Sequence, residues 1–416
     1  MQLLLWSPFS QVVAKISCLI LVAAYIGIAV CDLLAYRLGS SDEPRAIKQA
    51  IALNPWNASY RNRMGQYFMF SEQRPDLAIQ QYQSAVTLNP HMADYWLDLA
   101  NAYLSTGAGD KQELALERAL AVDPNTPIVL RQVANAFFMR GDLHKALGMY
   151  RFLLQTDRWE TEPTLQICWQ GTHDIDVMSE VMPPIPRVHL VFLKILIAEG
   201  KTDESELMWS RLIALQQPFD TTLAGPYVEY LIAQHDVNHA RAAWEDLGRM
   251  DPHFRPYLPS AGDLVVNGGF EEKIINMGFD WRYVVEPHAV VAVDTAQFHS
   301  GSRSLSVTFD GEAVVDIGLS QYIPVDANRR YNFTAYARAD DISAAQGPQF
   351  VISDAFTKNP FLQTEELLGT TGWRQFSGSF QTGPNTSLVS LRIMRAAGAG
   401  RITGKLGIDD VVVVSD

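Results

Sequence analysis

The chain has 416 residues, of which 48% are apolar and 19% charged, and its formal net charge is −13. This length predicts two or three domains that each bury a core, and the composition excludes wholesale disorder. An isoelectric point near 5.2 argues against a nucleic-acid partner, because contacts with phosphates require a basic surface.

The first predicted element is a transmembrane helix over about residues 12–36, within an N-terminal segment 1–41. Residues 16–31 carry no charge, and a helix of about 25 residues spans roughly 37 Å, enough to cross a hydrocarbon core of about 30 Å. A cleaved signal peptide is the competing interpretation, but no A-x-A cleavage site follows the run, which favours an uncleaved anchor. The orientation of the helix stays open. Basic residues tend to stay on the cytoplasmic side of a membrane, but this positive-inside rule is weak when a long domain follows the helix.

Similar phrases recur along the next part of the chain. Pro55, Pro90 and Pro124 close the phrases ALNP, TLNP and AVDP at spacings of 35 and 34 residues, and a later pair of prolines is again 34 residues apart. Apolar and small residues return with the same period, which is the signature of stacked helical hairpins. This pattern resembles the tetratricopeptide repeat family over residues 42–259, with a degenerate stretch at 157–186.

The resemblance implies an all-α superhelix whose groove, lined by the first helix of each repeat, binds protein partners. Groove asparagines would hydrogen-bond an extended peptide backbone, and a groove arginine would receive a carboxylate. Alignment of the repeats places five residues on this face: Gln66, Asn101, Arg131, Asn135 and Phe138. The alternative, that these are solvated helix-face residues, stays open.

After residue 262 the hydrophobic period changes from that of helices to that of strands. Short β-rich segments separated by Gly, Asn and Asp turns predict an all-β sandwich at 263–416. The opening phrase LVVNGGFEE, the central HSGSRSLSV and the closing GIDDVVV follow one another in an order that resembles the jelly-roll carbohydrate-binding modules found on xylanases and related glycoside hydrolases.

This second resemblance implies a structural calcium ion and a sugar site. Glu271 and Asp409 would give carboxylates to calcium, and backbone carbonyls and water would complete the six to eight oxygens that calcium takes. Sugar rings stack on aromatic side chains beside polar groups. The expected sugar-binding residues are Trp281, Tyr283, Tyr322 and Gln321, although Trp281 also matches a core tryptophan of such modules.

The sequence contains no GxSxG, HExxH or P-loop motif and no GxGxxG preceded by a strand, and we expect no enzymatic activity. His235 and His239 have the i, i+4 spacing of metal ligands but lack a third one.

The order of anchor, repeats and module predicts a multidomain, single-pass membrane protein of a bacterial envelope. Its soluble domains would be periplasmic or extracytoplasmic, its repeats would bind protein partners, and its sandwich would bind polysaccharide during surface polysaccharide assembly or export. The alternative is a pure protein–protein interaction scaffold whose sandwich binds no sugar.

Overall fold

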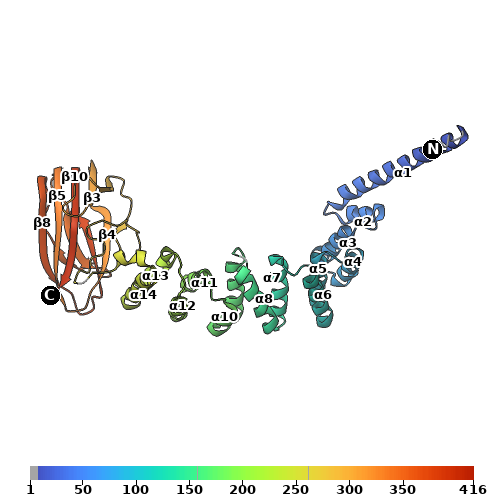
Figure 1. Ribbon diagram of the computed structural model, residues 1–416, viewed down its shortest axis with the longest axis horizontal. Coiled ribbons are helices and arrows are strands. Elements are labelled where there is room, and N and C mark those ends of the chain that lie inside the picture. Colours follow the sequence, from blue (N-terminus) through green and yellow to red (C-terminus); the bar gives the residue numbers. More distant parts are fainter. Residues whose placement is uncertain (1–7, 157, 261) are drawn as a thin grey trace, which may run out of the picture. The chain divides into compact units, whose positions relative to one another are not determined.

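Helices occupy the first part of the chain and strands the last part in the computed structural model, which describes residues 8–156, 158–260 and 262–416 (Figure 1). The chain divides into two compact units, Met1–Pro183 and Pro184–Asp416. The division lies near the end of the stretch in which the repeat period fails.

The N-terminal helix α1 (Pro8–Gly39) contains the predicted apolar run. Its segment Lys15–Gly39 is long and apolar enough to cross a membrane. A membrane anchor and a signal sequence share this property. The structure therefore supports an apolar helix here but does not distinguish between these two roles.

The last turns of α1 also belong to the helical array. Ala35 is buried in a small cluster with Ala50 of α2 (Pro44–Leu53) and Tyr60 of α3 (Ala58–Gln66). The Tyr60 ring lies so close to Gly39 that a Cβ atom there would come within 2.3 Å of it. Because α1 and α2 pack as a hairpin, the predicted boundary after residue 41 lies in the turn of that hairpin.

The rest of the first unit consists of consecutive helical hairpins. Alanines such as Ala85 and Ala119 are fully buried, so paired helices approach closely, as the spacing of small residues in the repeats predicts. The helices are α4 (Pro75–Leu88), α5 (Ala93–Ser105), α6 (Gly109–Val122), α7 (Pro127–Met139), α8 (Leu143–Thr156), α9 (Thr161–Thr172) and α10 (Ile175–Val181).

The second unit begins with two more hairpins. Their apolar faces are buried, most completely in α11, where Val188, Phe192 and Leu196 have no exposed surface. The helices are α11 (Pro186–Ala198), α12 (Thr202–Ala214), α13 (Gly225–Ala233) and α14 (Val237–Met250).

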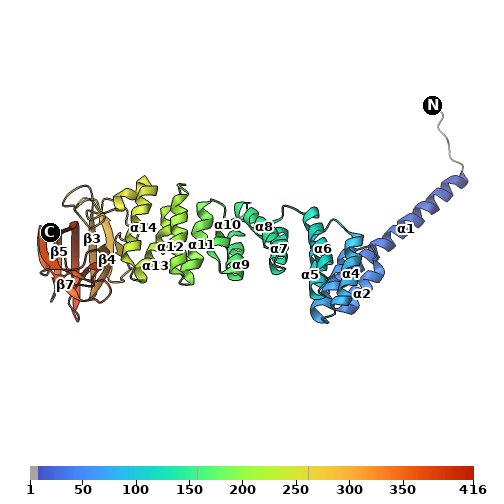
Figure 2. The same ribbon diagram turned by 90° about the horizontal axis from the view of Figure 1, so that it is seen from below.

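Two five-stranded antiparallel sheets follow and confirm the predicted sandwich (Figure 2). Strand alternation turns one face of each sheet towards a common core that includes Phe270, Trp281 and Phe333. The first sheet has the order β1 (Arg282–Tyr283), β4 (Asp316–Pro324), β9 (Leu388–Met394), β6 (Gln349–Asp354) and β7 (Pro360–Gln363). The second has the order β2 (Ala289–Asp294), β3 (Ser304–Ala313), β10 (Arg401–Ser415), β5 (Arg330–Ala344) and β8 (Gly369–Gln381).

The last hairpin packs directly on the sandwich. Glu229 of α13 accepts hydrogen bonds from the backbone N–H of Gly278 (2.6 Å) and from the guanidinium of Arg282 (2.8 Å). The Trp244 ring of α14 lies against Gly278, where a Cβ atom would come within 2.1 Å of it and where φ is +56°. Only glycine meets both conditions. The predicted boundary between residues 259 and 263 therefore marks the change from helices to strands, but both sides of it belong to one compact unit.

Candidate functional sites

The predicted protein-binding groove contains hydrogen bonds between neighbouring first helices. Gln66 donates to Asp98 of α5 (2.9 Å), and Asn62 donates to the same carboxylate oxygen (2.8 Å). Burial raises the pKa of Asp98, although both hydrogen bonds oppose that effect. Gln66 is thus half-buried and already bonded to its neighbour in the array.

Two further groove residues are bonded within the array. Nε of Arg131 lies 2.6 Å from Oε2 of Glu160, at the start of α9. The Asn135 side-chain oxygen accepts a hydrogen bond from the Tyr150 hydroxyl (2.6 Å). A peptide carboxylate at Arg131 would therefore compete with Glu160.

Phe138 and Asn101 differ in their surroundings. The Phe138 ring packs on Gly171 of α9, where a Cβ atom would come within 2.3 Å of it. Asn101 of α5 is exposed. Of the five predicted groove residues, Asn101 is the most accessible to a partner.

Two of the four predicted sugar-binding residues lie in the core, and the structure corrects their assignment. Trp281 has no exposed surface, and its indole N–H donates to the Asn267 carbonyl (3.0 Å). Gln321 is also fully buried, and its amide bonds to both the N–H and the carbonyl of Val266 (3.2 and 2.7 Å). Because both side chains are fully buried, neither can contact a sugar. Their hydrogen bonds instead hold the first segment of the sandwich in place.

The two tyrosines do not form a common platform. The Arg282 guanidinium lies over the Tyr322 ring, 4.5 Å from its centroid, on the outer face of the first sheet. Tyr283 is paired with Leu319, which faces the core, so strand alternation places Tyr283 on the opposite side of β1 from Arg282. One face of the Tyr322 ring is therefore covered by a cation that is itself held by Glu229.

The outer face of the first sheet carries an ion pair that the sequence analysis did not select. In β9, Leu391 and Ile393 face the core, and Arg392 between them points outward. Arg392 is ion-paired with Asp316 of β4, and both side chains remain partly exposed. A single charged residue in an otherwise uncharged strand was the available signal.

A second polar group lies on the same sheet. The Gln349 amide nitrogen donates to Glu366 (3.2 Å), and its oxygen accepts from the amide of Gln363 on β7. Val351 of β6 is paired with Arg392 on one side and with Gln363 on the other, so strand pairing brings the two polar groups onto one surface. We define the outer polar face by these five residues: Asp316, Gln349, Gln363, Glu366 and Arg392. Such groups can hydrogen-bond hydroxyls.

The predicted calcium ligand Glu271 holds a loop. Oε1 accepts from the N–H groups of Ser302 (2.7 Å) and Arg303 (3.1 Å), and Oε2 accepts from the Ser302 hydroxyl (2.7 Å). The hydrogen bonds from Ser302 hold the pKa of Glu271 below its ordinary value. Glu271 is therefore ionised and oriented towards the loop that contains His299.

Asp409 holds the first half of the same loop from the other side. Oδ2 accepts from the N–H groups of His299 (2.7 Å) and Ser300 (3.2 Å), and Oδ1 from that of Asp410 (2.8 Å). Asp409 has no exposed surface, and burial raises its pKa. Among the described side chains no basic one is ion-paired with Asp409, so its carboxyl group has only backbone N–H donors as partners.

Three acidic residues approach Gly269, although their carboxylate oxygens do not all lie within 4.8 Å of one another. A Cβ atom at Gly269 would lie 3.7 Å from Oδ1 of Asp410, 3.8 Å from Oδ1 of Asp409 and 3.9 Å from Cγ of Glu271. Calcium takes hard oxygen donors of this kind, although the Asp410 carboxylate already accepts from the Ser300 hydroxyl (2.8 Å) and lies 2.6 Å from Nδ1 of His299. Glu271, Asp409 and Asp410 are the side chains that would hold the ion.

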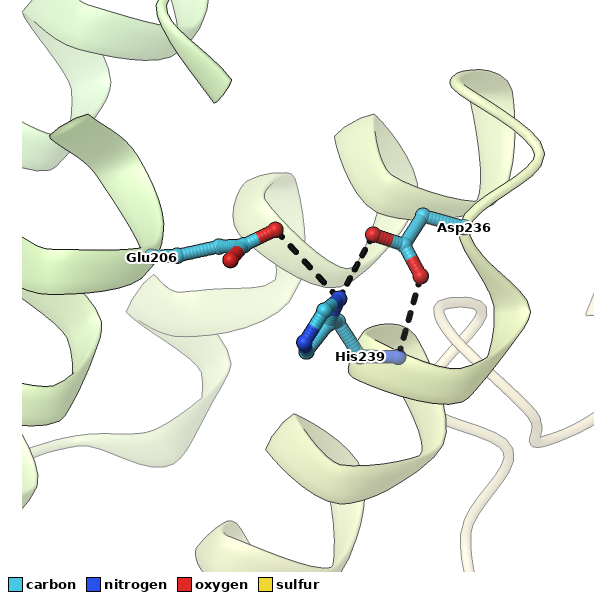
Figure 3. Close-up of side chains that lie close together, drawn as sticks. All are labelled: Glu206, Asp236 and His239. Carbon is cyan, nitrogen blue, oxygen red and sulfur yellow. Dashed lines mark hydrogen bonds and ion pairs between the residues drawn. The ribbon is translucent and has the colours of Figure 1, made fainter. Parts of the chain in front are cut away.

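The i, i+4 histidine pair is separated by the fold. His235 stacks on Phe356, with ring centroids 3.9 Å apart. His239 instead faces two acids: its Nδ1 atom lies 2.7 Å from Asp236 and 3.3 Å from Glu206 of α12 (Figure 3). Among the described residues this is the one group of His, Cys and acidic side chains whose ligand atoms all lie within 4.8 Å of one another.

The contacts of this cluster are those of a helix cap. Asp236 precedes α14, and its second oxygen accepts from the backbone N–H of His239 (3.2 Å). The hydrogen bond to Asp236 raises the pKa of His239. Because the ring is hydrogen-bonded to Asp236 and lies beside Glu206, we interpret the cluster as an ion pair that links α12 to α14.

Two family models match the chain. Residues 69–136 match the tetratricopeptide repeat, and residues 262–396 match a carbohydrate binding domain. The chain thus contains repeats of a protein-interaction kind and a carbohydrate-binding module domain. Both are non-catalytic kinds, and no catalytic family matches. Comparison with curated proteins finds no match.

Solved structures of both kinds are similar to parts of the chain. A CBM4 structure has 15% sequence identity, with 36% of this chain and 99% of that chain covered and a TM-score of 0.29. MamA has 18% identity, coverage of 42% and 86% and a TM-score of 0.25. PilF of Pseudomonas aeruginosa has 14% identity, coverage of 54% and 94% and a TM-score of 0.29.

Proposed function

We propose that this chain is a membrane-anchored binding protein of a bacterial envelope that joins protein partners to a glycan during surface polysaccharide assembly or export. The observation that carries the proposal is the combination, in one chain, of an apolar helix, a matched repeat region and a matched carbohydrate-binding domain. With α1 uncleaved in the inner membrane, the domains would be periplasmic, where they would meet exported polysaccharide.

The outer polar face is the proposed sugar site. Arg392 and Asp316 form a partly exposed charged pair, and Gln363 and Glu366 lie on the same face of the sheet, where both are hydrogen-bonded to the buried Gln349. Planar amide, carboxylate and guanidinium groups recognise sugar hydroxyls through directed hydrogen bonds. Tyr322 would add an aromatic edge at the end of this face.

A glycan array probed with the full chain in detergent tests the proposal. We expect reproducible binding that weakens about tenfold or more in Arg392→Ala, since a hydrogen bond to a charged group contributes about 1.5–3 kcal/mol. Arg401→Ala is the matched control, because Arg401 is an exposed arginine on the other sheet, 3.7 Å from Glu312. Equal loss in both variants, or binding unchanged in Arg392→Ala, would contradict the assignment of the site.

A second candidate function is a protein–protein scaffold whose sandwich binds no sugar. The contact of Glu229 with Arg282, and of Arg282 with the Tyr322 ring, favours it. These groups connect the sandwich to the repeats at one edge of the sheet that carries the proposed sugar site. A folded chain that binds no glycan on the array would favour this candidate.

We also propose a structural calcium ion between the acids around Gly269. Glu271 and Asp409 hold the two halves of one loop, and Asp409 is buried without a basic partner among the described side chains. Calcium would supply positive charge between the opening segment of the sandwich and its last strand.

A further inference from the structure

The apolar run of α1 ends at a residue that is bonded to the helical array. Asp32 is the first charged residue after the uncharged stretch 16–31 and lies four residues before the end of the predicted span 12–36, so in a membrane-spanning α1 its carboxylate lies at the headgroup end of the span. Its carboxylate accepts a hydrogen bond from the Asn54 side chain (2.8 Å). The turn after α2 is thereby held beside α1 at the depth of Asp32.

The same turn presents a tryptophan. The Asn54 amide that donates to Asp32 also accepts from the backbone N–H of Trp56 (3.3 Å). The Trp56 side chain is 81% exposed. A single amide thus connects Asp32 of α1 with an indole that has few contacts in the protein.

The surrounding surface suits the headgroup region of a bilayer. Leu33 and Tyr36, just beyond Asp32 on α1, are also exposed. Residues 32–56 contain three acidic and three basic side chains, so the surface has no net charge to select anionic lipids. Tryptophan and tyrosine are enriched where apolar and wet surroundings meet at a membrane.

We propose that the turn containing Trp56 is a second membrane contact, in which the indole inserts at the headgroup level of the phospholipid bilayer that α1 spans. This inference rests on the proposed membrane anchor. Because α1 continues without a break from Pro8 to Gly39 and packs on α2 and α3, two contacts on one rigid hairpin would restrict the tilt of the first repeats against the membrane.

Difference fluorescence on the full chain in phosphatidylcholine vesicles tests the contact. The emission of Trp56 is the wild-type signal minus that of Trp56→Phe, and the control is the emission lost in Trp159→Phe, because Trp159 is 90% exposed in the loop before α9. We expect lipids brominated near the headgroup end of the acyl chain to quench the Trp56 component at least twofold more than the Trp159 component. Aqueous iodide should show the reverse order.

Equal quenching of both components by iodide, with no effect of brominated lipid on Trp56, would overturn the contact while leaving the anchor intact. Flotation of the vesicles separates the two hypotheses. A folded chain that does not float with them would overturn the anchor, and the contact with it.

Discussion

At the scale of single residues, the proposed calcium ion can be tested at Glu271. We expect calcium to raise the melting temperature of the full chain and EGTA to reverse the rise. At about 100 times Kd, mass action stabilises by about 2.7 kcal/mol, or roughly 5–10 °C for a unit of this size. In Glu271→Gln an oxygen acceptor for Ser302 and Arg303 remains but the charge is lost, so the shift should disappear.

Glu312→Gln is the control for this experiment, because Glu312 is an exposed acid at the other end of β3. Its variant should keep the full calcium shift. A wild-type chain whose melting temperature is the same in calcium and in EGTA would exclude a stabilising ion at Glu271 and Asp409.

At the scale of elements, His239 connects α12 and α14 in a way that depends on pH. Its hydrogen bond to Asp236 raises its pKa above the ordinary 6.5. The ion pair therefore contributes to the free energy of unfolding in full below about pH 6.5, and the contribution is lost as the pH rises through the raised pKa. We expect His239→Gln to lower the melting temperature more at pH 6 than at pH 9, measured by circular dichroism.

His91→Gln provides the comparison, since His91 is an exposed histidine in the turn before α5. Its effect should be the same at both pH values. If His239→Gln also had equal effects at pH 6 and pH 9, the cluster would not act through the protonated ring.

At the scale of the whole molecule, the two compact units should unfold separately, with α11–α14 in the same transition as the sandwich. Glu229→Ala removes the acceptor for Gly278 and Arg282. It should lower the free energy of unfolding of the second unit alone, by about 1–3 kcal/mol. Asp98→Ala removes the acceptor for Asn62 and Gln66 and should lower only the stability of the first unit, residues 1–183. Calorimetry of the full chain measures both, and one transition that both variants lower would contradict the division.

Local pattern in the sequence was sufficient for much of this protein. The apolar run, the 34-residue period and the short alternating strands each depend on residues that are neighbours in the chain, so they predict the N-terminal helix, the hairpins and the sandwich. The family matches to the repeat and to the carbohydrate-binding domain confirm the last two. Glu271 and Asp409 were selected as calcium ligands through the resemblance to carbohydrate-binding modules; the structure bonds both to one loop, and the calcium ion stays a prediction.

Only the tertiary structure decided which faces are free. Gln321 appeared suited to a sugar site, yet its amide bonds to Val266, 55 residues away, and is buried. Arg392 went unselected because its ion pair with Asp316, 76 residues away in the chain, depends on how β4 and β9 pair. The packing of α13 and α14 on the sandwich depends on Glu229 meeting Gly278 and Arg282. The sequence determined the elements because helical and strand periods are local, whereas exposure depends on long-range pairing.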